Sequence, residues 1–334
     1  MKYQKMGRSN LSVSRICLGT MHFGGIADER ESHRIMGKAL ETGINFFDTA
    51  NVYGMPAAHG LTEEIIGRWF AQGGGRRDGV VLATKVYGRM IEKDTPPNEE
   101  GGLSAYKIRR HAADSLLRLQ TDHIDLYQVH HIDRRIPMEE YWGAFEQLMR
   151  RGEVLYTGTS NFPGWGLVKH QLAARQRGLL GIVSEQSQYN LLNRWPELEV
   201  IPAAFDLGIG IMAYMPLAGG LLTGKGTAPT GSRTATVEGE YHRKLDKDAV
   251  FGEFSKLCRE MGERETAVAI AWVLANPAVY SAIVGIRTTA QLDGLERAAE
   301  LNLDDEVMKK LDSIFDINKG RPLKKGPIPE AFAW

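Results

Sequence analysis

Short runs of apolar and β-branched residues alternate along the chain with stretches whose apolar residues recur at helical spacing. This alternation is typical of a parallel sheet covered by helices. The pattern predicts eight strands, at Arg15 to Leu18, Ile44 to Phe47, Val80 to Thr84, Ile124 to Val129, Leu155 to Gly158, Ile182 to Glu185, Gly210 to Ala213 and Ala282 to Val284. We therefore expect one α/β domain over residues 1–334, a single (β/α)8 TIM barrel.

Segments outside the strands complete this prediction. Residues Tyr3 to Val13 can form a short β-hairpin through Gly7-Arg8-Ser9-Asn10, which would close the floor of the barrel. Tyr87 to Gly102 and Gly226 to Asp246 are expected to be long active-site loops, because loops of that length are usually functional or mobile. Helical faces toward the core are predicted at Ile35, Ala39, Leu40, Leu116, Leu117 and Leu119, a helix C-cap at Gly43 and an N-cap at Ser104.

Composition narrows the functional classes. Lys plus Arg and Asp plus Glu each number 41, so the formal net charge of +0 favours neither nucleic acid nor a membrane as a partner. Cys17 and Cys258 lie far apart without metal-ligand spacing, and we expect buried thiols in a reducing compartment and no metal. Without an apolar signal region or a long apolar run, the cytoplasm is the expected location.

Four polar residues stand at the ends of predicted strands: Asp48 and Tyr53 after the second, Lys85 after the third and His130 after the fourth. In a barrel these strand ends converge on the face where active sites are built. A tyrosine hydroxyl has a pKa of about 10, so a proton-donating tyrosine needs a nearby cation. Lys85 can be that cation, with Asp48 as its partner. His130 can orient a substrate oxygen.

Each of these residues alone has another explanation. Tyr53 could be a packed loop aromatic, and Lys85 a surface residue with a buried stem. His130 could be a core histidine, and the adjacent His131 is equally suited on chemical grounds. Their coincidence at successive strand ends favours a shared site.

Three motifs contain these residues: Gly43-Ile44-Asn45-Phe46-Phe47-Asp48-Thr49-Ala50 continuing to Tyr53-Gly54, then Leu82-Ala83-Thr84-Lys85, and Asp125-Leu126-Tyr127-Gln128-Val129-His130. They resemble the signatures of the aldo-keto reductase superfamily, and the likeness covers nearly the full chain. The resemblance implies that Asp48, Tyr53, Lys85 and His130 are a catalytic tetrad, and it favours His130 over His131.

The same resemblance implies NADPH (NADP+) as the cofactor. Ser160, Asn161 and Gln186 would bind the nicotinamide carboxamide, and Tyr214 would stack on the ring. The other implied contacts are Gly19, Thr20, Met21 and Asp48 near the ribose and nicotinamide, Met215, Pro216, Leu217, Gly219, Lys225 and Arg233 along the pyrophosphate, and Gly285, Arg287 and Gln291 near the 2′-phosphate. An arginine there favours NADPH because a guanidinium meets a phosphate bidentately. The family usually has Glu and Asn where this chain has Gly294 and Leu295, and Ser where it has Met215.

We therefore expect a reductase in which hydride from nicotinamide C4 attacks a small-molecule carbonyl while Tyr53 protonates its oxygen. The runs Thr62 to Phe70 and His130 to Arg134 resemble bacterial reductases, some acting on nucleotide-linked deoxysugars. Keto or 2,3-enoyl reduction of such a sugar, with Arg134 or Arg135 meeting its diphosphate, is one alternative. A non-catalytic NADP(H)-sensing subunit, like the potassium-channel beta subunits, is another, and His130 argues against it. The expected substrate lining is His22, Phe23, Met55, Tyr87, Met90, Trp165 and Met215. Members of this group occur as monomers and as larger assemblies.

Overall fold

A closed barrel of parallel strands lies at the centre of the computed structural model, which describes residues 1–54, 59–90, 102–224 and 247–316. The barrel strands run in the order β10-β3-β4-β5-β6-β7-β8-β9. They are β3 Ile16–Gly19, β4 Phe46–Asp48, β5 Val81–Val86, β6 Ile124–Val129, β7 Val154–Ser160, β8 Ile182–Gln188, β9 Gly210–Tyr214 and β10 Val279–Gly285. All eight predicted strands and the barrel are confirmed, although β5 continues two residues beyond its predicted end at Thr84.

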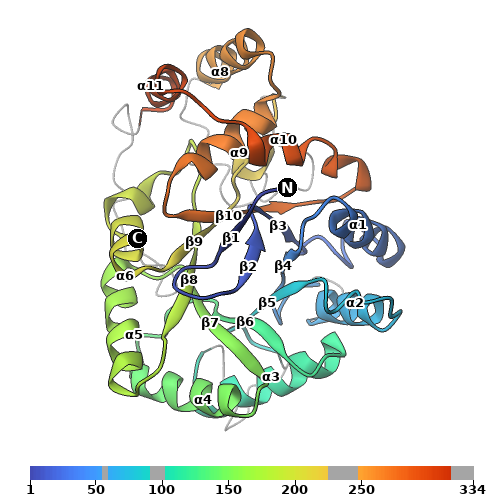
Figure 1. Ribbon diagram of the computed structural model, residues 1–334, viewed down its shortest axis with the longest axis vertical. Helices are drawn as coiled ribbons and strands as arrows, with labels where there is room; N and C mark the ends of the chain where they lie inside the picture. Colours follow the sequence, from blue (N-terminus) through green and yellow to red (C-terminus); the bar gives the residue numbers. More distant parts are fainter. Residues whose placement is uncertain (55–58, 91–101, 225–246, 317–334) are drawn as a thin grey trace.

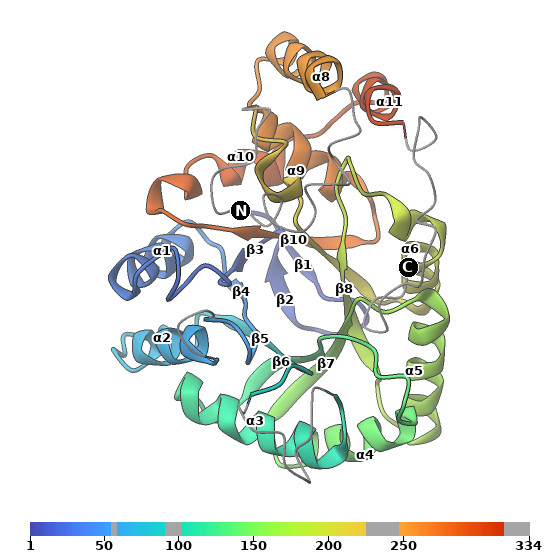
Figure 2. The ribbon, with the colours of Figure 1, turned by 180° about the vertical axis from the view of Figure 1, so that it is seen from behind.

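Helices surround the barrel on its outside (Figures 1 and 2). They are α1 Glu29–Glu41, α2 Leu61–Phe70, α3 Ala105–Leu119, α4 Met138–Arg150, α5 Gly164–Gln176, α6 Val200–Leu207, α8 Lys247–Met261, α9 Glu265–Ala275, α10 Leu295–Glu300 and α11 Asp305–Ile314, with short 3₁₀ turns η1 Trp195–Leu198, η2 Ala218–Gly220 and η4 Thr289–Leu292. The helices α8 and α11 lie side by side beyond α9 in both views. None of the helices in the described ranges is long and apolar enough to cross a membrane.

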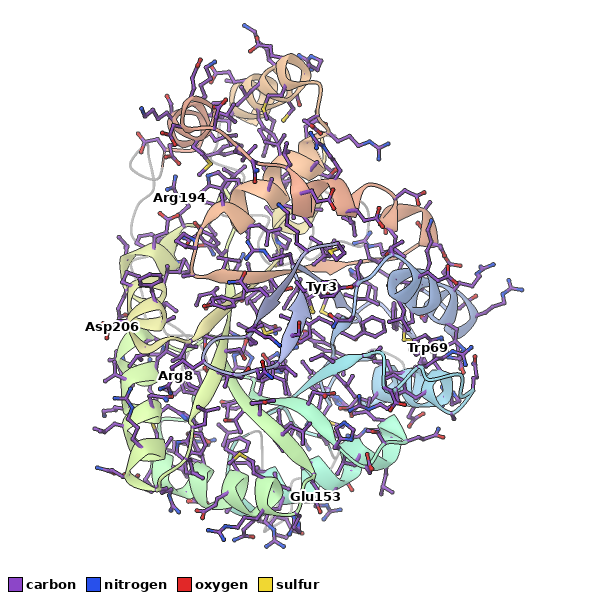
Figure 3. All side chains as sticks on the ribbon, viewed as in Figure 1. Tyr3, Arg8, Trp69, Glu153, Arg194 and Asp206 are labelled. Atoms are coloured by element: carbon purple, nitrogen blue, oxygen red, sulfur yellow. The ribbon has the colours of Figure 1, made fainter. Side chains whose placement is uncertain are left out.

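The N-terminal hairpin consists of β1 Tyr3–Lys5 and β2 Ser12–Ser14, as predicted. It lies across one end of the barrel, where Figure 3 labels Tyr3, whose hydroxyl donates to the Gly43 carbonyl over 2.9 Å. The hairpin residues Met6 and Val13 are fully buried in the cluster that fills the barrel. Because this cluster includes the inward residues near the strand starts, the hairpin closes the barrel floor.

Strand alternation creates two cores. Residues pointing inward fill the barrel, among them Cys17, Phe46, Ala83, Leu126 and Met212. Residues pointing outward pack beneath the helices in a larger cluster. Cys17 and Cys258 are both buried and unpaired, as predicted.

The predicted helix caps are confirmed, whereas one predicted core-facing residue is not. Gly43 follows α1 with φ 85, and Ser104 caps α3 by accepting from the Lys107 amide. The prediction that Leu117 faces the core is wrong, because its side chain is 77% exposed. Leu119, two residues further along α3, takes the buried position. Most of the two predicted long loops, 91–101 and 225–246, lies outside the described residues.

Candidate active site

The four predicted catalytic residues lie together at the carboxyl ends of neighbouring strands. Asp48 is the last residue of β4, Lys85 lies inside β5, and His130 directly follows β6. Each of the strand residues points inward because it stands two positions beyond a barrel-filling residue, as Asp48 does after Phe46 and Lys85 after Ala83. Tyr53 reaches the same point from the turn after β4.

Lys85 is the centre of this cluster. Its ammonium donates to Asp48 Oδ2 over 2.6 Å, to the Thr49 carbonyl over 2.9 Å and to the Tyr53 hydroxyl over 3.3 Å. The side chain is completely buried. Burial lowers the pKa of Lys85, but attraction to Asp48 and Tyr53 outweighs this effect, so the pKa stands above its ordinary value. The amine is therefore a cation held against the tyrosine oxygen.

Asp48 connects this cluster to the opposite wall of the barrel. Its Oδ1 accepts from Gln128 Nε2 over 3.0 Å and from Gln186 Nε2 over 2.9 Å. Gln128 was missed by the sequence reasoning, although a glutamine within the otherwise apolar end of β6 was a usable signal. Gly158 makes room for it, because a Cβ there would lie 3.2 Å from Gln128 Cγ. The carboxylate is thus satisfied on both oxygens before any substrate binds.

Both histidines named from the sequence lie at this end of the barrel. The His130 ring meets the Tyr53 ring edge-on, with centroids 6.0 Å apart. The His131 ring stacks on His130 at 4.7 Å and meets Tyr87 edge-on at 5.2 Å. Of the two rings, His130 is therefore the one that packs against Tyr53, and His131 lies behind it.

The predicted nicotinamide contacts form a second hydrogen-bonded group. Asn161 Oδ1 accepts from the Tyr214 hydroxyl over 2.9 Å, and its Nδ2 donates to the His130 carbonyl over 3.2 Å. Ser160 Oγ donates to the Gln186 carbonyl over 3.0 Å. Gln186 uses its amide hydrogens on Asp48 and on Gln128 Oε1, the latter over 3.3 Å, which directs its own carbonyl oxygen elsewhere. Two acceptor oxygens, on Asn161 and Gln186, are therefore oriented by the protein.

The segment after β3 lies beside Asp48. Thr20 is fully buried and donates to the Asp48 carbonyl with both its amide, over 3.0 Å, and its hydroxyl, over 2.9 Å. Gly19 ends β3, where a Cβ would lie 2.9 Å from the Ile283 side chain. Met21 is partly exposed. The β3 end is thus tied to the same aspartate as the lysine.

The predicted pyrophosphate segment follows β9. Met215 has the left-handed φ of 54, and its carbonyl accepts from Asn190 Nδ2 over 2.9 Å. Pro216 and Leu217 lead into η2, where Gly219 has φ 67. The predicted anion partners Lys225 and Arg233 lie outside the described residues. The described part of this segment is a tight turn at the carboxyl end of the barrel.

The predicted adenosine segment follows Gly285, the last residue of β10. Gln291 accepts from the Arg287 amide over 2.7 Å and caps η4, so its side chain shapes the loop itself. Gly294, with φ 88, is the N-cap of α10, and Leu295 is buried. The two departures from the family pattern therefore have structural roles here.

The expected substrate lining divides into three groups. His22, Tyr87, Met90 and Met215 are partly exposed, and Trp165 is 43% exposed. Phe23 is completely buried in the outer core, so its predicted place in the lining is wrong: the loop after β3 folds back and packs this ring inward. Met55 lies outside the described residues.

Comparisons with known proteins agree with this geometry. Residues 15–316 match the aldo/keto reductase family. The chain is 54% identical over 338 residues to the Bacillus subtilis protein named uncharacterized oxidoreductase YrpG, with 100% of both chains covered. It is 32% identical over 333 residues to a probable voltage-gated potassium channel subunit beta of Arabidopsis thaliana, covering 96% of this chain and 99% of that one. It is 30% identical over 342 residues to protein tas of Escherichia coli, covering 95% and 98%.

Proposed function

The chain belongs to the aldo/keto reductase family and is an oxidoreductase, and from this premise we propose that it reduces a carbonyl compound with NADPH, using Tyr53 as the proton donor. One observation carries the proposal. The buried Lys85 ammonium lies 3.3 Å from the Tyr53 hydroxyl and 2.6 Å from Asp48. A cation at that position stabilises the phenolate that remains when the hydroxyl gives up its proton.

The residues present fit a nicotinamide. A carboxamide group needs acceptors for its N–H groups, and the oriented oxygens of Asn161 and Gln186 provide them. Tyr214 stands beside Asn161 as the ring that would stack. When bound, the reduced nicotinamide supplies a hydride to the carbonyl carbon. The chain's part is to fix the orientation of the ring and of the carbonyl.

The proton path follows from the cluster geometry. Tyr53 donates its hydroxyl proton to the carbonyl oxygen as negative charge develops there. Lys85 stays protonated because Asp48 balances its charge, so it can hold the resulting phenolate. His130, packed edge-on against Tyr53, orients the carbonyl oxygen. The product is an alcohol.

Arg287 supports NADPH over NADH. Its guanidinium makes no ion pair with the side chains that the structure describes, so it can pair with a 2′-phosphate. Two buried, unpaired thiols, Cys17 and Cys258, support a reducing compartment, and we place the enzyme in the cytoplasm.

Replacing Tyr53 by Phe tests the proposal. Tyr53→Phe is expected to bind NADPH nearly as the wild type does and to lose carbonyl turnover by about 100- to 10,000-fold, the usual contribution of a general acid. Tyr106→Phe, on the outer face of α3, is the matched control and should keep full activity. Unchanged turnover in Tyr53→Phe would refute the assignment. Tight NADPH binding by the wild type without turnover of any carbonyl would instead support a non-catalytic subunit; the Arabidopsis relative is named a probable voltage-gated potassium channel subunit beta.

One feature of the described surface favours a nucleotide-linked sugar as the substrate. The exposed Trp165 ring has Arg134 at 5.9 Å and Lys169 at 5.2 Å. An indole flanked by two cations suits a ligand with an aromatic base and a diphosphate. In contrast, Arg135 is held by Asp133 over 3.0 Å. Parallel assays with a keto sugar nucleotide and with aromatic aldehydes separate this candidate from a general carbonyl reductase.

A further inference from the structure

The turn between β7 and α5 has a backbone that needs external support. Asn161, which directly follows β7, has φ 58, a left-handed conformation that costs a residue with a side chain about 1 kcal/mol. Such conformations persist where surrounding contacts hold them. On the barrel side, the Asn161 amide donates to the Gln186 carbonyl over 3.0 Å. This hydrogen bond holds the turn only on the side that faces the barrel.

Glu185 holds the other side of the same turn. Its Oε1 accepts from the Phe162 amide over 3.1 Å and from Ser187 Oγ over 3.0 Å, and its Oε2 accepts from Thr159 Oγ1 over 2.5 Å. The Glu185 side chain therefore accepts hydrogen bonds from the end of β7, from the turn that follows β7, and from β8.

A β-bulge determines which of these two adjacent residues of β8 points into the barrel. The register between β7 and β8 shifts between Thr157 and Gly158, which leaves Val183 as an extra residue. A bulge reverses the in–out alternation beyond it. Gln186 consequently points into the barrel toward Asp48, and Glu185 points outward beneath the helices.

Glu185 is also an unusual residue for its surroundings. Its side chain is completely buried, and none of the described Lys, Arg or His side chains forms an ion pair with it. Burial raises the pKa of Glu185 to about 8, against the opposing effect of its donors. A buried acid without a cation is costly. Its presence where several donors converge indicates a positional role.

We propose that Glu185 is a positioning residue that holds the left-handed turn at Asn161, so that the Asn161 carboxamide faces the ligand at the carboxyl end of the barrel. The inference rests on the proposed function, in which Asn161 contacts the nicotinamide. Glu185 does not itself meet substrate or cofactor. It acts through the Phe162 amide and the hydroxyl of Thr159.

Two substitutions at this position separate positioning from packing. Glu185→Gln keeps an acceptor for Phe162 and a polar group for Thr159, and should retain wild-type affinity for NADPH. Glu185→Leu removes these contacts at similar volume. It should weaken NADPH binding by about tenfold, the size of one lost hydrogen bond, while the KM of the carbonyl substrate stays within about twofold. In the ligand-free protein, amide hydrogen exchange should rise at Asn161 and Phe162 in Glu185→Leu but not in Glu185→Gln.

Asp125 supplies the matched control. It is a buried acid that holds the Leu82 amide over 2.9 Å, away from the strand ends that carry the site. Asp125→Leu should lower the melting temperature without changing the ratio of NADPH affinity to substrate KM. If Glu185→Leu does not fold, Thr159→Val removes a single donor and should weaken NADPH binding by about threefold, less than one full hydrogen bond.

The outcomes are distinct. A folded Glu185→Leu, or failing that Thr159→Val, with wild-type NADPH affinity and unchanged exchange at Phe162 would overturn the inference. If the wild type itself does not bind NADPH, the proposed function fails. The exchange measurement on the ligand-free protein still decides whether Glu185 holds the turn.

Discussion

Gln186 donates a hydrogen bond to Asp48 over 2.9 Å across the barrel, although β8 and β4 are not neighbouring strands. This bond joins the two groups of the site. Asp48 balances the Lys85 charge with one oxygen and fixes the Gln186 amide with the other. Tyr53, the proposed proton donor, and the predicted nicotinamide contacts are therefore parts of one network.

A carboxylate in place of Gln186 should make stability depend on pH. In Gln186→Glu, the new carboxyl would replace the amide that now donates to Asp48 over 2.9 Å, so two carboxyls would lie in contact. Two negative charges so close together raise the pKa of one of the carboxyls in the folded state. A carboxyl whose folded pKa is raised stabilises at low pH and loses that contribution as pH rises. We expect melting temperatures near wild type at pH 5 and clearly lower at pH 8. A melting temperature lowered equally at pH 5 and pH 8 would contradict this prediction. The control is Gln188→Glu, because Gln188 is partly exposed on the same strand.

Removing the buried ammonium should separate stability from chemistry. Lys85→Met leaves the Asp48 carboxylate buried without a cation, which should cost about 3–5 kcal/mol in the free energy of unfolding. Adding Asp48→Asn removes that charge and should recover most of the loss. Neither variant should turn over a carbonyl, since both lack the cation beside Tyr53. Denaturant unfolding measures the stabilities; a double variant no more stable than Lys85→Met would count against the buried pair.

Arg287 should determine the preference for the phosphorylated cofactor. Arg287→Ala is expected to raise the KM for NADPH by about ten- to a hundredfold, the range of a charge-assisted bidentate contact, and to leave the KM for NADH unchanged. Arg297→Ala is the control, because that guanidinium is already held by Glu263 over 2.9 Å. Steady-state kinetics with NADPH and with NADH measure both KM values. An equal rise in the KM for NADH would show that Arg287 does not contact the 2′-phosphate.

His170 should weaken the fold in mild acid. Its ring is completely buried among Tyr141, Trp142 and Phe162, with no hydrogen-bond partner for either nitrogen in the described ranges. Burial lowers its pKa from 6.5 to about 3. Between these values the unfolded chain binds the extra proton, so the stability present above pH 6.5 falls as pH falls.

The cost to the wild type between pH 7 and pH 5 should be about 2 kcal/mol from this histidine. His170→Leu should lack that part of the pH dependence in denaturant unfolding at the two pH values. His59→Leu, at an exposed position, should retain it. A His170→Leu protein with the full wild-type slope would show that other groups cause the loss.

Local sequence patterns predicted most of the architecture. Apolar and β-branched runs such as Ile124 to Val129 predicted the strands, and the Gly43 and Ser104 signals predicted helix ends. These features depend on side-chain spacing and on backbone conformations set within a few residues, so they can be read along the chain. Leu117 shows the limit: the helix was predicted, but which of its leucines face the core depended on how α3 packs.

The polar strand ends at Asp48, Lys85 and His130 were likewise visible in the sequence, because parallel strands bring their carboxyl ends to one face. Their distances were not. The 2.6 Å contact of Lys85 with Asp48 and the convergence of Gln128 and Gln186 on Asp48 exist only once the barrel closes in its observed register. The outward turn of Glu185 depends on a bulge that no local pattern predicts. Spacing along the chain determined the fold and predicted the catalytic side chains. Long-range register, which depends on the whole closed sheet, decided which contacts hold those side chains in place.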